Sequence, residues 1–398
     1  MGGGLDRDGD GDGEYRLAPE VLGSSALMGL PVLPGLHVDA HCVTPLADGI
    51  GSRAWFDVIA LSDGRAALLV GDVIEPGRSA TAVTGQVRAI MAPLLSQAHD
   101  LVAALERFSA EVDGQDPTCA TTVCVAIVDP IDGDVQYTTC GHPPPMVVAA
   151  GRARILRSTG GGVLRRNQPV RIETAHLDRD EVLLLHTDAL SGPARLAVAG
   201  GLAELPNSPA GASTAGGRSD DLSARTSELC RATAEEMLRG GTRDDLAVLA
   251  VQSRPGVPEL DMTVKALPSS LETVREAVGD WLSGLRSSIE DGAGMALAVG
   301  EAMANAVQHA FVGARAGSVT VTAKLSVDGV LACSVRDDGH WLPRASSRPG
   351  QAGRGLRLMA RGCDRMVISR DPGGTVVELS RRLHHPVSRA VIADRVLP

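Results

Sequence analysis

The sequence predicts an α+β protein of two domains. Its 398 residues exceed what one hydrophobic core usually organises, and 44% of them are hydrophobic, which is enough for two cores. Apolar runs of strand length alternate with helical patterns along most of the chain, and Pro255 and Pro258 interrupt this alternation. These features divide the chain into a disordered, acidic and glycine-rich tail over 1–36, a first domain over 37–253, a linker over 254–258, a second domain over 259–383 and a loose tail over 384–398.

Two pairs of apolar runs in the first domain predict β-hairpins. Residues 54–61 and 65–72 are joined by a Ser-Asp-Gly turn, and residues 121–129 and 135–140 flank an Asp-Gly turn. The other elements expected in this domain are helices within 79–112 and near 223–239, strands at 181–188 and 245–252, and a mobile insert over about 192–222.

The second domain is predicted to begin with a strand near 261–267. Its remaining expected elements are helices at 269–285, 293–311 and 355–363, strands at 317–325, 330–336, 364–369 and 375–380, and a loop at 338–353.

Composition argues against several kinds of partner. The formal net charge of −10 repels a phosphate backbone, and an aromatic content of 2% leaves few platforms for base stacking, so we expect no nucleic-acid partner. No run approaches the ~20 apolar residues of a membrane span, and no signal peptide begins the chain. The seven cysteines lack zinc spacing and are expected to be small buried residues. We therefore expect a cytoplasmic protein without a membrane partner.

A polar stripe marks the helix expected at 293–311. Glu301, Asn305 and His309 are spaced four apart, so a helix aligns them on one face. An asparagine amide oxygen suits Mg²⁺, and a glutamate can act as a general base. Taken alone, the stripe is equally compatible with an exposed polar face, and His309 with a packed or capping role.

Further polar and glycine positions follow in order. Asp337 with Gly339 ends a predicted strand, which suits a carboxylate that accepts a proton from an adenine amino group. Gly353 and Gly355 open a predicted helix, where backbone N–H groups can bind phosphate. A Gly-Thr pair containing Thr375 begins the last strand.

The order Glu-x-x-x-Asn, Asp-x-Gly, Gly-x-Gly-Leu, Gly-Thr resembles the GHKL superfamily of histidine-kinase-like ATPases, and within it the anti-sigma-factor serine kinases. The resemblance covers about 125 residues. It implies that ATP binds with Mg²⁺ held by Asn305, and that Glu301 is the candidate base that activates a serine hydroxyl. The residues implied to contact adenine or to shape the nucleotide site are Asp337, Gly339, Gly353, Gly355 and Thr375.

Three aspartates lie at the ends or starts of strands expected in the first domain: Asp72, Asp188 and Asp244. Carboxylates that converge from such positions can hold two divalent ions, which would activate a water and bind a phosphoryl group. For any one of them taken alone, an ordinary acidic turn is the better explanation.

The phrases around these aspartates, together with Cys-Gly-His-Pro-Pro-Pro at 140–145, resemble the SpoIIE-type phosphatases of the protein phosphatase 2C class over about 215 residues. The resemblance implies Mn²⁺ or Mg²⁺ at Asp72, Asp188 and Asp244, joined by the backbone carbonyl of Val73. Gly141 and His142 are expected to support the fold, and Asp57 to face either the core or the metal rim.

The chain departs from this family pattern in three places. Ala54 stands where the family has an acidic residue before Trp55, and Ile74-Glu75-Pro76-Gly77 replaces Ser-Gly-His-Gly after the Gly-Asp-Val phrase. Ala189 replaces the glycine after Asp188. These changes keep the metal aspartates and alter the loops around them.

The resemblances imply an α/β/β/α two-sheet sandwich followed by a two-layer α/β domain with a single mixed sheet and helices on one face. They also imply a protein serine/threonine phosphatase joined to a kinase-like domain. Its expected partners are a phosphorylated anti-sigma-factor antagonist, a sigma factor and ATP, and a homodimer remains open. The alternatives are a degenerate phosphatase that acts as a partner-binding scaffold and binds ATP only, or a protein that only hydrolyses ATP.

Overall fold

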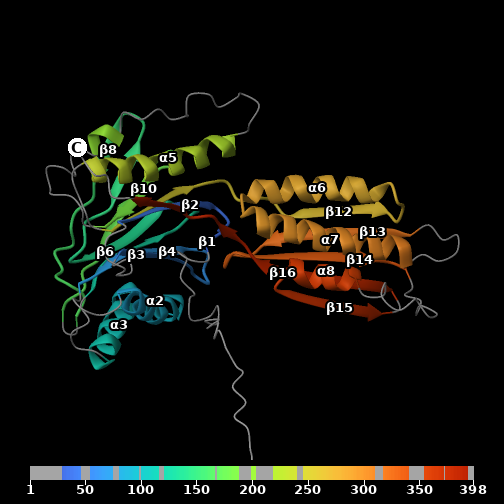
Figure 1. Cartoon of the computed structure of the whole chain (residues 1–398), viewed down its shortest axis with the longest axis horizontal. Helices are drawn as coiled ribbons and strands as arrows, with labels where there is room; N and C mark the ends of the chain where they lie inside the picture. Colours follow the sequence, from blue (N-terminus) through green and yellow to red (C-terminus); the bar gives the residue numbers. More distant parts are fainter. Residues whose placement is uncertain are drawn as a thin grey trace, which may run out of the picture.

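Two strand-rich halves follow one another along the chain in the computed structural model (Figure 1). The structure describes residues 29–45, 54–74, 80–97, 100–115, 121–165, 168–187, 199–202, 218–239, 245–309, 317–339, 354–371 and 373–392. Asp188, Asp244, Gly353 and most of the segment 192–222 lie outside these residues.

The two predicted hairpins form the middle of a five-stranded sheet, the first sheet, in the order β3-β4-β5-β6-β9 with all pairs antiparallel. Gly64 makes the β3–β4 turn with φ of 90°, and the Asp63 carboxylate accepts the Arg65 N–H at 3.1 Å. The strands are β3 (Ala54–Ala60), β4 (Ala66–Val73), β5 (Thr121–Val128), β6 (Asp134–Cys140) and β9 (Glu173–His176).

A second sheet has the order β18-β2-β11-β10-β7-β8. Its strands are β2 (Leu36–Pro45), β7 (Met146–Ala149), β8 (Arg152–Ile155), β10 (Val182–His186), β11 (Leu246–Ser253) and β18 (Ser388–Ile392). The short strands β7, β8 and β9 were not expected from the sequence.

The two sheets stack between helices, which gives four layers (Figure 1). Side chains such as Phe56 and Leu68 from the first sheet meet Leu183 and Leu249 from the second in a fully buried core. Helices α2 (Ala80–Gln97) and α3 (Leu101–Gln115) cover the outer face of the first sheet, and α5 (Arg218–Arg239) covers that of the second. The predicted α/β/β/α sandwich is confirmed.

The second half is a five-stranded sheet, the third sheet, in the order β12-β13-β14-β16-β15. Its strands are β12 (Leu260–Lys265), β13 (Ser318–Leu325), β14 (Val330–Asp337), β15 (Arg365–Asp371) and β16 (Gly374–Arg382). Helices α6 (Ser270–Leu285), α7 (Ile289–His309) and α8 (Arg354–Gly362) share its core, so the two-layer prediction is confirmed. The expectation of a mixed sheet was wrong, because all four strand pairs are antiparallel.

The expectation that residues 1–36 and 384–398 form no regular structure was wrong for part of each segment. Residues within 1–36 and 384–398 form strands, namely β1 (Leu30–Pro31), β17 (His384–His385) and β18. β1 pairs with β17, and β18 pairs in parallel with β2, so the end of the chain returns to the second sheet. Among the helices that the structure describes, none is long and apolar enough to cross a membrane.

Candidate functional site

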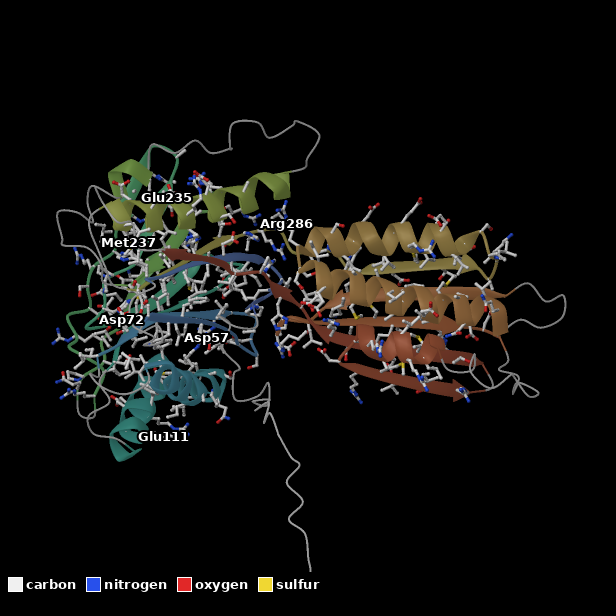
Figure 2. The ribbon with its side chains drawn as sticks, viewed as in Figure 1. Asp57, Asp72, Glu111, Glu235, Met237 and Arg286 are labelled. Carbon is white, nitrogen blue, oxygen red and sulfur yellow. The ribbon has the colours of Figure 1, made fainter. Side chains whose placement is uncertain are left out.

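Asp72 lies at the end of β4 on the face that looks toward the second sheet. Along β4, Ala66, Leu68 and Val70 point into the core between the sheets, and Ala67 and Leu69 point toward α2 and α3. Because side chains alternate along a strand, Asp72 continues the inward row. Its side chain is 27% exposed, so the carboxylate lies at the mouth of the space between the sheets (Figure 2).

Groups from β5 and from the segment that follows β6 lie next to Asp72. Thr122 is its cross-strand partner, and the Thr121 hydroxyl donates to the Asp72 carbonyl at 2.9 Å. Nδ1 of the buried His142 ring lies 3.1 Å from the Thr122 hydroxyl and 3.9 Å from an Asp72 carboxylate oxygen. His142 thus supports the position of Asp72. Thr122 was missed by sequence reasoning, although its place opposite Asp72 follows once the two strands are paired in register.

A short crossing places the end of β10 and the start of β11 at the same end of the sandwich as Asp72. The chain leaves the first sheet at Cys140 and enters the second at Met146, which pairs with Leu184 of β10. Five linking residues span at most ~18 Å, and stacked sheets lie ~10 Å apart, so β10 ends at the Asp72 end. β11 begins there too, because His186 pairs with Val248.

The described residues next to the two other metal candidates pack together at this end. The Thr187 N–H donates to the Ala247 carbonyl at 3.0 Å, and the Ala247 N–H donates to the Thr187 hydroxyl at 3.2 Å. Asp188 follows Thr187 directly, and Asp244 is three residues before Ala247. In the described part of the chain no group of three metal-ligating side chains occurs, and both of these aspartates lie outside it. Three carboxylates are a donor set that suits Mg²⁺ or Mn²⁺.

Asp57 faces the helices rather than the metal rim. It lies between Trp55 and Ile59 on the β3 face that packs against α2 and α3. A carboxylate oxygen lies 3.7 Å from Nε of Arg88 on α2, and both side chains are buried. Figure 2 labels Asp57 and Asp72 on the first sheet. Asp57 therefore has a structural ion-pair partner on the face opposite to that of Asp72.

Ala54 lies directly opposite Asp72 in the β3–β4 ladder. It belongs to the inward-facing row with Phe56 and Val58 and packs against the core between the sheets. The carboxylate that the family pattern has at this position would therefore stand beside Asp72, and this chain has a methyl group instead.

Three residues of the predicted nucleotide site meet where α7 and α8 pack together. A Cβ on Gly355 would lie 2.9 Å from a Glu301 carboxylate oxygen and 3.6 Å from the Asn305 amide nitrogen. The first turn of α8 thus lies against both polar side chains of α7, and Ala302, Met303 and Ala306 of α7 are buried in the core. The His309 side chain and Gly353 are outside the described residues.

A second group of predicted residues gathers at the ends of β14 and β16. One carboxylate oxygen of Asp337, Oδ1, accepts the N–H groups of Gly339 and Thr375 at 3.1 and 3.2 Å. Burial raises the pKa of Asp337. The Thr375 hydroxyl is buried and has no hydrogen-bond partner among the described residues. Gly374, with φ of 135°, allows this approach because a Cβ there would lie 1.8 Å from the Asp337 carbonyl oxygen.

These features fit the adenine end of a nucleotide. The second oxygen of Asp337 can accept an amino proton, and the Thr375 hydroxyl supplies one more polar group toward a ligand. A buried hydroxyl without a partner is costly unless a ligand or water satisfies it.

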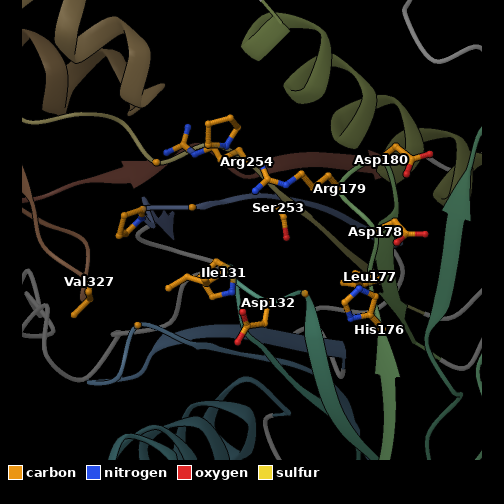
Figure 3. Close-up of a pocket in the computed structure, with 17 residues that line it drawn as sticks. Ile131, Asp132, His176, Leu177, Asp178, Arg179, Asp180, Ser253, Arg254 and Val327 are labelled. Carbon is orange, nitrogen blue, oxygen red and sulfur yellow. The ribbon is translucent and has the colours of Figure 1, made fainter.

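A large cavity of about 780 Å³ lies at the opposite end of the sandwich (Figure 3). Its lining includes Ile131 in the β5–β6 turn, Ser253 and Arg254 at the end of β11, and Val327 from the β13–β14 turn. Since Asp72 lies at the other end of β4, this cavity is separate from the candidate metal centre.

Comparisons with known proteins agree with this geometry. Residues 62–254 match the family Stage II sporulation protein E (SpoIIE), and residues 264–381 match the histidine kinase-like ATPase domain. The crystal structure of the RsbU and RsbW domains of Rv1364c from Mycobacterium tuberculosis is 30% identical, with a TM-score of 0.75. This similarity covers 91% of this chain and 99% of that one.

Two weaker similarities involve the first domain. The PP2C phosphatase domain of SpoIIE from Bacillus subtilis, with a fragment of its regulatory domain, is 14% identical and has a TM-score of 0.45. It covers 55% of this chain and 63% of its own. The catalytic domain of the serine/threonine phosphatase PstP, solved with two manganese ions, is 15% identical and has a TM-score of 0.40. It covers 55% of this chain and 98% of its own. With the Rv1364c domains matched over nearly their whole length, the chain belongs to the family in which a SpoIIE-type PP2C phosphatase domain is fused to an RsbW-like histidine kinase-like ATPase domain.

Proposed function

We propose that this protein is a metal-dependent protein serine/threonine phosphatase whose second domain binds ATP with Mg²⁺. One observation carries the proposal: Asp72 lies at the mouth between the two sheets, at the end where β10 ends and β11 begins. The strand ends next to Asp188 and Asp244 lie at the same end of the sandwich as Asp72, which supports a shared metal site.

The residues proposed to hold divalent ions are Asp72, Asp188 and Asp244, with the backbone carbonyl of Val73. Bound there, Mn²⁺ or Mg²⁺ would supply an activated water for attack on the phosphorus of a phosphoserine or phosphothreonine. The His142 ring, which is hydrogen-bonded to Thr122 of β5, lies 3.9 Å from an Asp72 carboxylate oxygen and would help to position that carboxylate.

In the second domain, Asp337 and Thr375 would bind the adenine ring, and Asn305 would hold Mg²⁺ near the phosphates. Gly353 and Gly355 would present backbone N–H groups from the start of α8. For phosphate transfer, Glu301 would accept the proton of a serine hydroxyl while that oxygen bonds to the γ-phosphorus of ATP and ADP leaves. The contact of Gly355 with Glu301 and Asn305 supports this arrangement.

We further propose that the two activities oppose each other on one partner. The phosphatase domain would dephosphorylate an anti-sigma-factor antagonist, and the kinase-like domain would phosphorylate that antagonist or hold a sigma factor. The match with the RsbU and RsbW domains supports this proposal.

One observation favours a second candidate, a degenerate phosphatase that acts as a regulatory scaffold. Ala54 stands directly across from Asp72, so this position lacks the carboxylate that would have joined the metal rim. A site short of one anionic ligand would bind metal more weakly and turn over little substrate.

The deciding experiment measures phosphate release from an aryl phosphate and a phosphoserine peptide with Mn²⁺ present. Asp72→Asn should lower kcat/KM at least ~100-fold, because it removes a metal ligand. Asp63→Asn is the matched control, since Asp63 lies in the exposed turn at the other end of the same hairpin. If the wild-type protein shows no metal-dependent turnover but still binds a fluorescent ATP analogue, the scaffold reading replaces the phosphatase.

A further inference from the structure

Each half of the molecule contains a hydrophobic side chain from the other end of the chain. Val32, which precedes β2 of the first domain, is fully buried in the core beneath α6, α7 and the third sheet. Val387, which follows the last strand of the second domain, packs against the core between the first two sheets. Leu30 and Leu33, on either side of Val32, belong to that first-domain core. The segment before β2 therefore contributes a side chain to the core of the second domain, and the segment after β16 contributes one to the core of the first.

Backbone hydrogen bonds hold these two terminal segments against each other. The Val32 N–H donates to the Leu383 carbonyl at 3.0 Å, and the Leu383 N–H donates to the Gly329 carbonyl at 3.1 Å. Leu30 pairs with His385 in the β1–β17 ladder. Gly329 is required at this junction, because a Cβ there would lie 2.8 Å from the Val32 carbonyl oxygen.

Polar contacts fix the chain where it leaves the second domain. Asp291, in the first turn of α7, accepts the His384 N–H at 2.9 Å and the Arg381 Nε–H at 2.7 Å. The buried His385 ring donates from Nδ1 to the Arg286 carbonyl at 2.6 Å. It also meets the His37 ring of β2 edge-on, with centroids 5.4 Å apart.

From this junction the chain continues along β2 toward the candidate metal centre. β18 pairs with the second half of β2, from Ser388 opposite His41 to Ile392 opposite Pro45. In the same half of β2, Val43 pairs with Leu246 at the start of β11, two residues after Asp244. The end of the chain thus joins α7 of the nucleotide domain to the metal end of the second sheet.

We propose that residues 384–392 are a strap that makes the two domains one cooperative unit, so that nucleotide binding in the second domain stabilises the metal end of β2 in the first. The segment is hydrogen-bonded to Asp291 of α7 in the second domain and places Val387 against the core of the first, so unfolding of one domain breaks contacts that hold the segment on the other. The second half of this proposal rests on the proposed nucleotide binding, and the first half does not.

The first test follows thermal unfolding of the full chain by calorimetry. The wild-type protein should unfold in one transition whose calorimetric enthalpy equals its van't Hoff enthalpy. A chain ending at Leu383, and separately Val387→Asp in the full chain, should show two transitions. Val327→Asp is the matched control, because Val327 is 45% exposed and should keep the single transition. Two independent transitions in the wild type, or one transition in both strap variants, would overturn the strap.

The second test measures amide hydrogen exchange with and without ADP and Mg²⁺. In the wild type, bound ADP should slow exchange in β2 at least threefold. In Val387→Asp it should slow exchange in β13 and β14 but leave β2 unchanged. A fluorescent ADP analogue measures binding separately. If ADP binds the wild type and β2 is unaffected, the coupling is refuted. If ADP does not bind, nucleotide binding fails and with it the coupling, and the unfolding transitions still decide the strap.

Discussion

The buried histidine of the strap makes the stability of the protein depend on pH in a defined direction. His385 is 3% exposed, and burial lowers its pKa to about 3, with His37 and Arg254 acting in the same direction. The groups opposing this shift are the Arg286 carbonyl, which accepts from the ring, and the nearby Asp39 carboxylate. The folded protein therefore holds this imidazole neutral.

The direction of this pH dependence follows from the difference in proton binding between the folded and the unfolded state. The folded pKa of His385 lies below the unfolded value near 6.5, so its unfolded form binds the proton more tightly. The stability that depends on neutral His385 is fully present above about pH 6.5 and is lost progressively as the pH falls toward about 3. Between pH 8 and pH 5 the loss amounts to about 2 kcal/mol in the free energy of unfolding.

The assay is urea unfolding at pH 8, 7, 6 and 5 for the wild type and His385→Asn. Asparagine keeps a donor for the Arg286 carbonyl but cannot titrate, so the variant should lose about 2 kcal/mol less than the wild type over this range. Val327→Asn is the control, because Val327 is 45% exposed, does not titrate and lies outside the strap, so this variant should keep the wild-type pH dependence. If the stabilities of the wild type and His385→Asn fall in parallel, the reasoning is refuted.

Two further substitutions test the candidate sites. Gly355→Ala brings a methyl group to 2.9 Å from the flexible Glu301 side chain, so we expect little change in stability and about a tenfold loss in affinity for an ATP analogue. Gly300→Ala, on α7, is the control, because a Cβ at Gly300 meets nothing within 4 Å. This variant should raise the free energy of unfolding by about 0.5–1 kcal/mol and leave nucleotide binding intact. Ala54→Asp adds a carboxylate opposite Asp72, and titration with Mn²⁺ should show about tenfold tighter binding, whereas unchanged affinity would mean that Ala54 is outside the metal rim.

Local sequence was sufficient to predict an element when its own residues contain a clear pattern. The β3–β4 hairpin could be predicted because apolar runs flank a turn in which Asp63 and Gly64 have defined backbone roles. The four-residue strands β7, β8 and β9 were missed because so short a segment shows no resolvable period. The antiparallel arrangement of the third sheet depends on strand order, which local pattern does not encode.

The sequence predicted which residue types form the candidate sites, but not on which face of a strand each side chain lies. Asp57 illustrates the limit: every interior residue of β3 is buried, so no polar alternation shows which face looks toward α2 and which toward the second sheet. Only the pairing of β3 with β4 and the contact with Arg88 assign Asp57 to the helical side. The same pairing placed Ala54 opposite Asp72, so the acidic residue that the family pattern has at this position would lie beside Asp72.

The chain ends show most clearly why a boundary drawn from sequence differs from one drawn from packing. Proline residues at 254–258 mark where the covalent linker lies, and the sequence matches respect that division. Yet the partner of β1 is β17, more than 350 residues away, and no local window contains both. Cutting the chain at the linker would remove Val32 from the core of the second domain and Val387 from that of the first. We therefore expect each isolated half to be less stable than the same half in the full chain, because each loses a side chain from its own core.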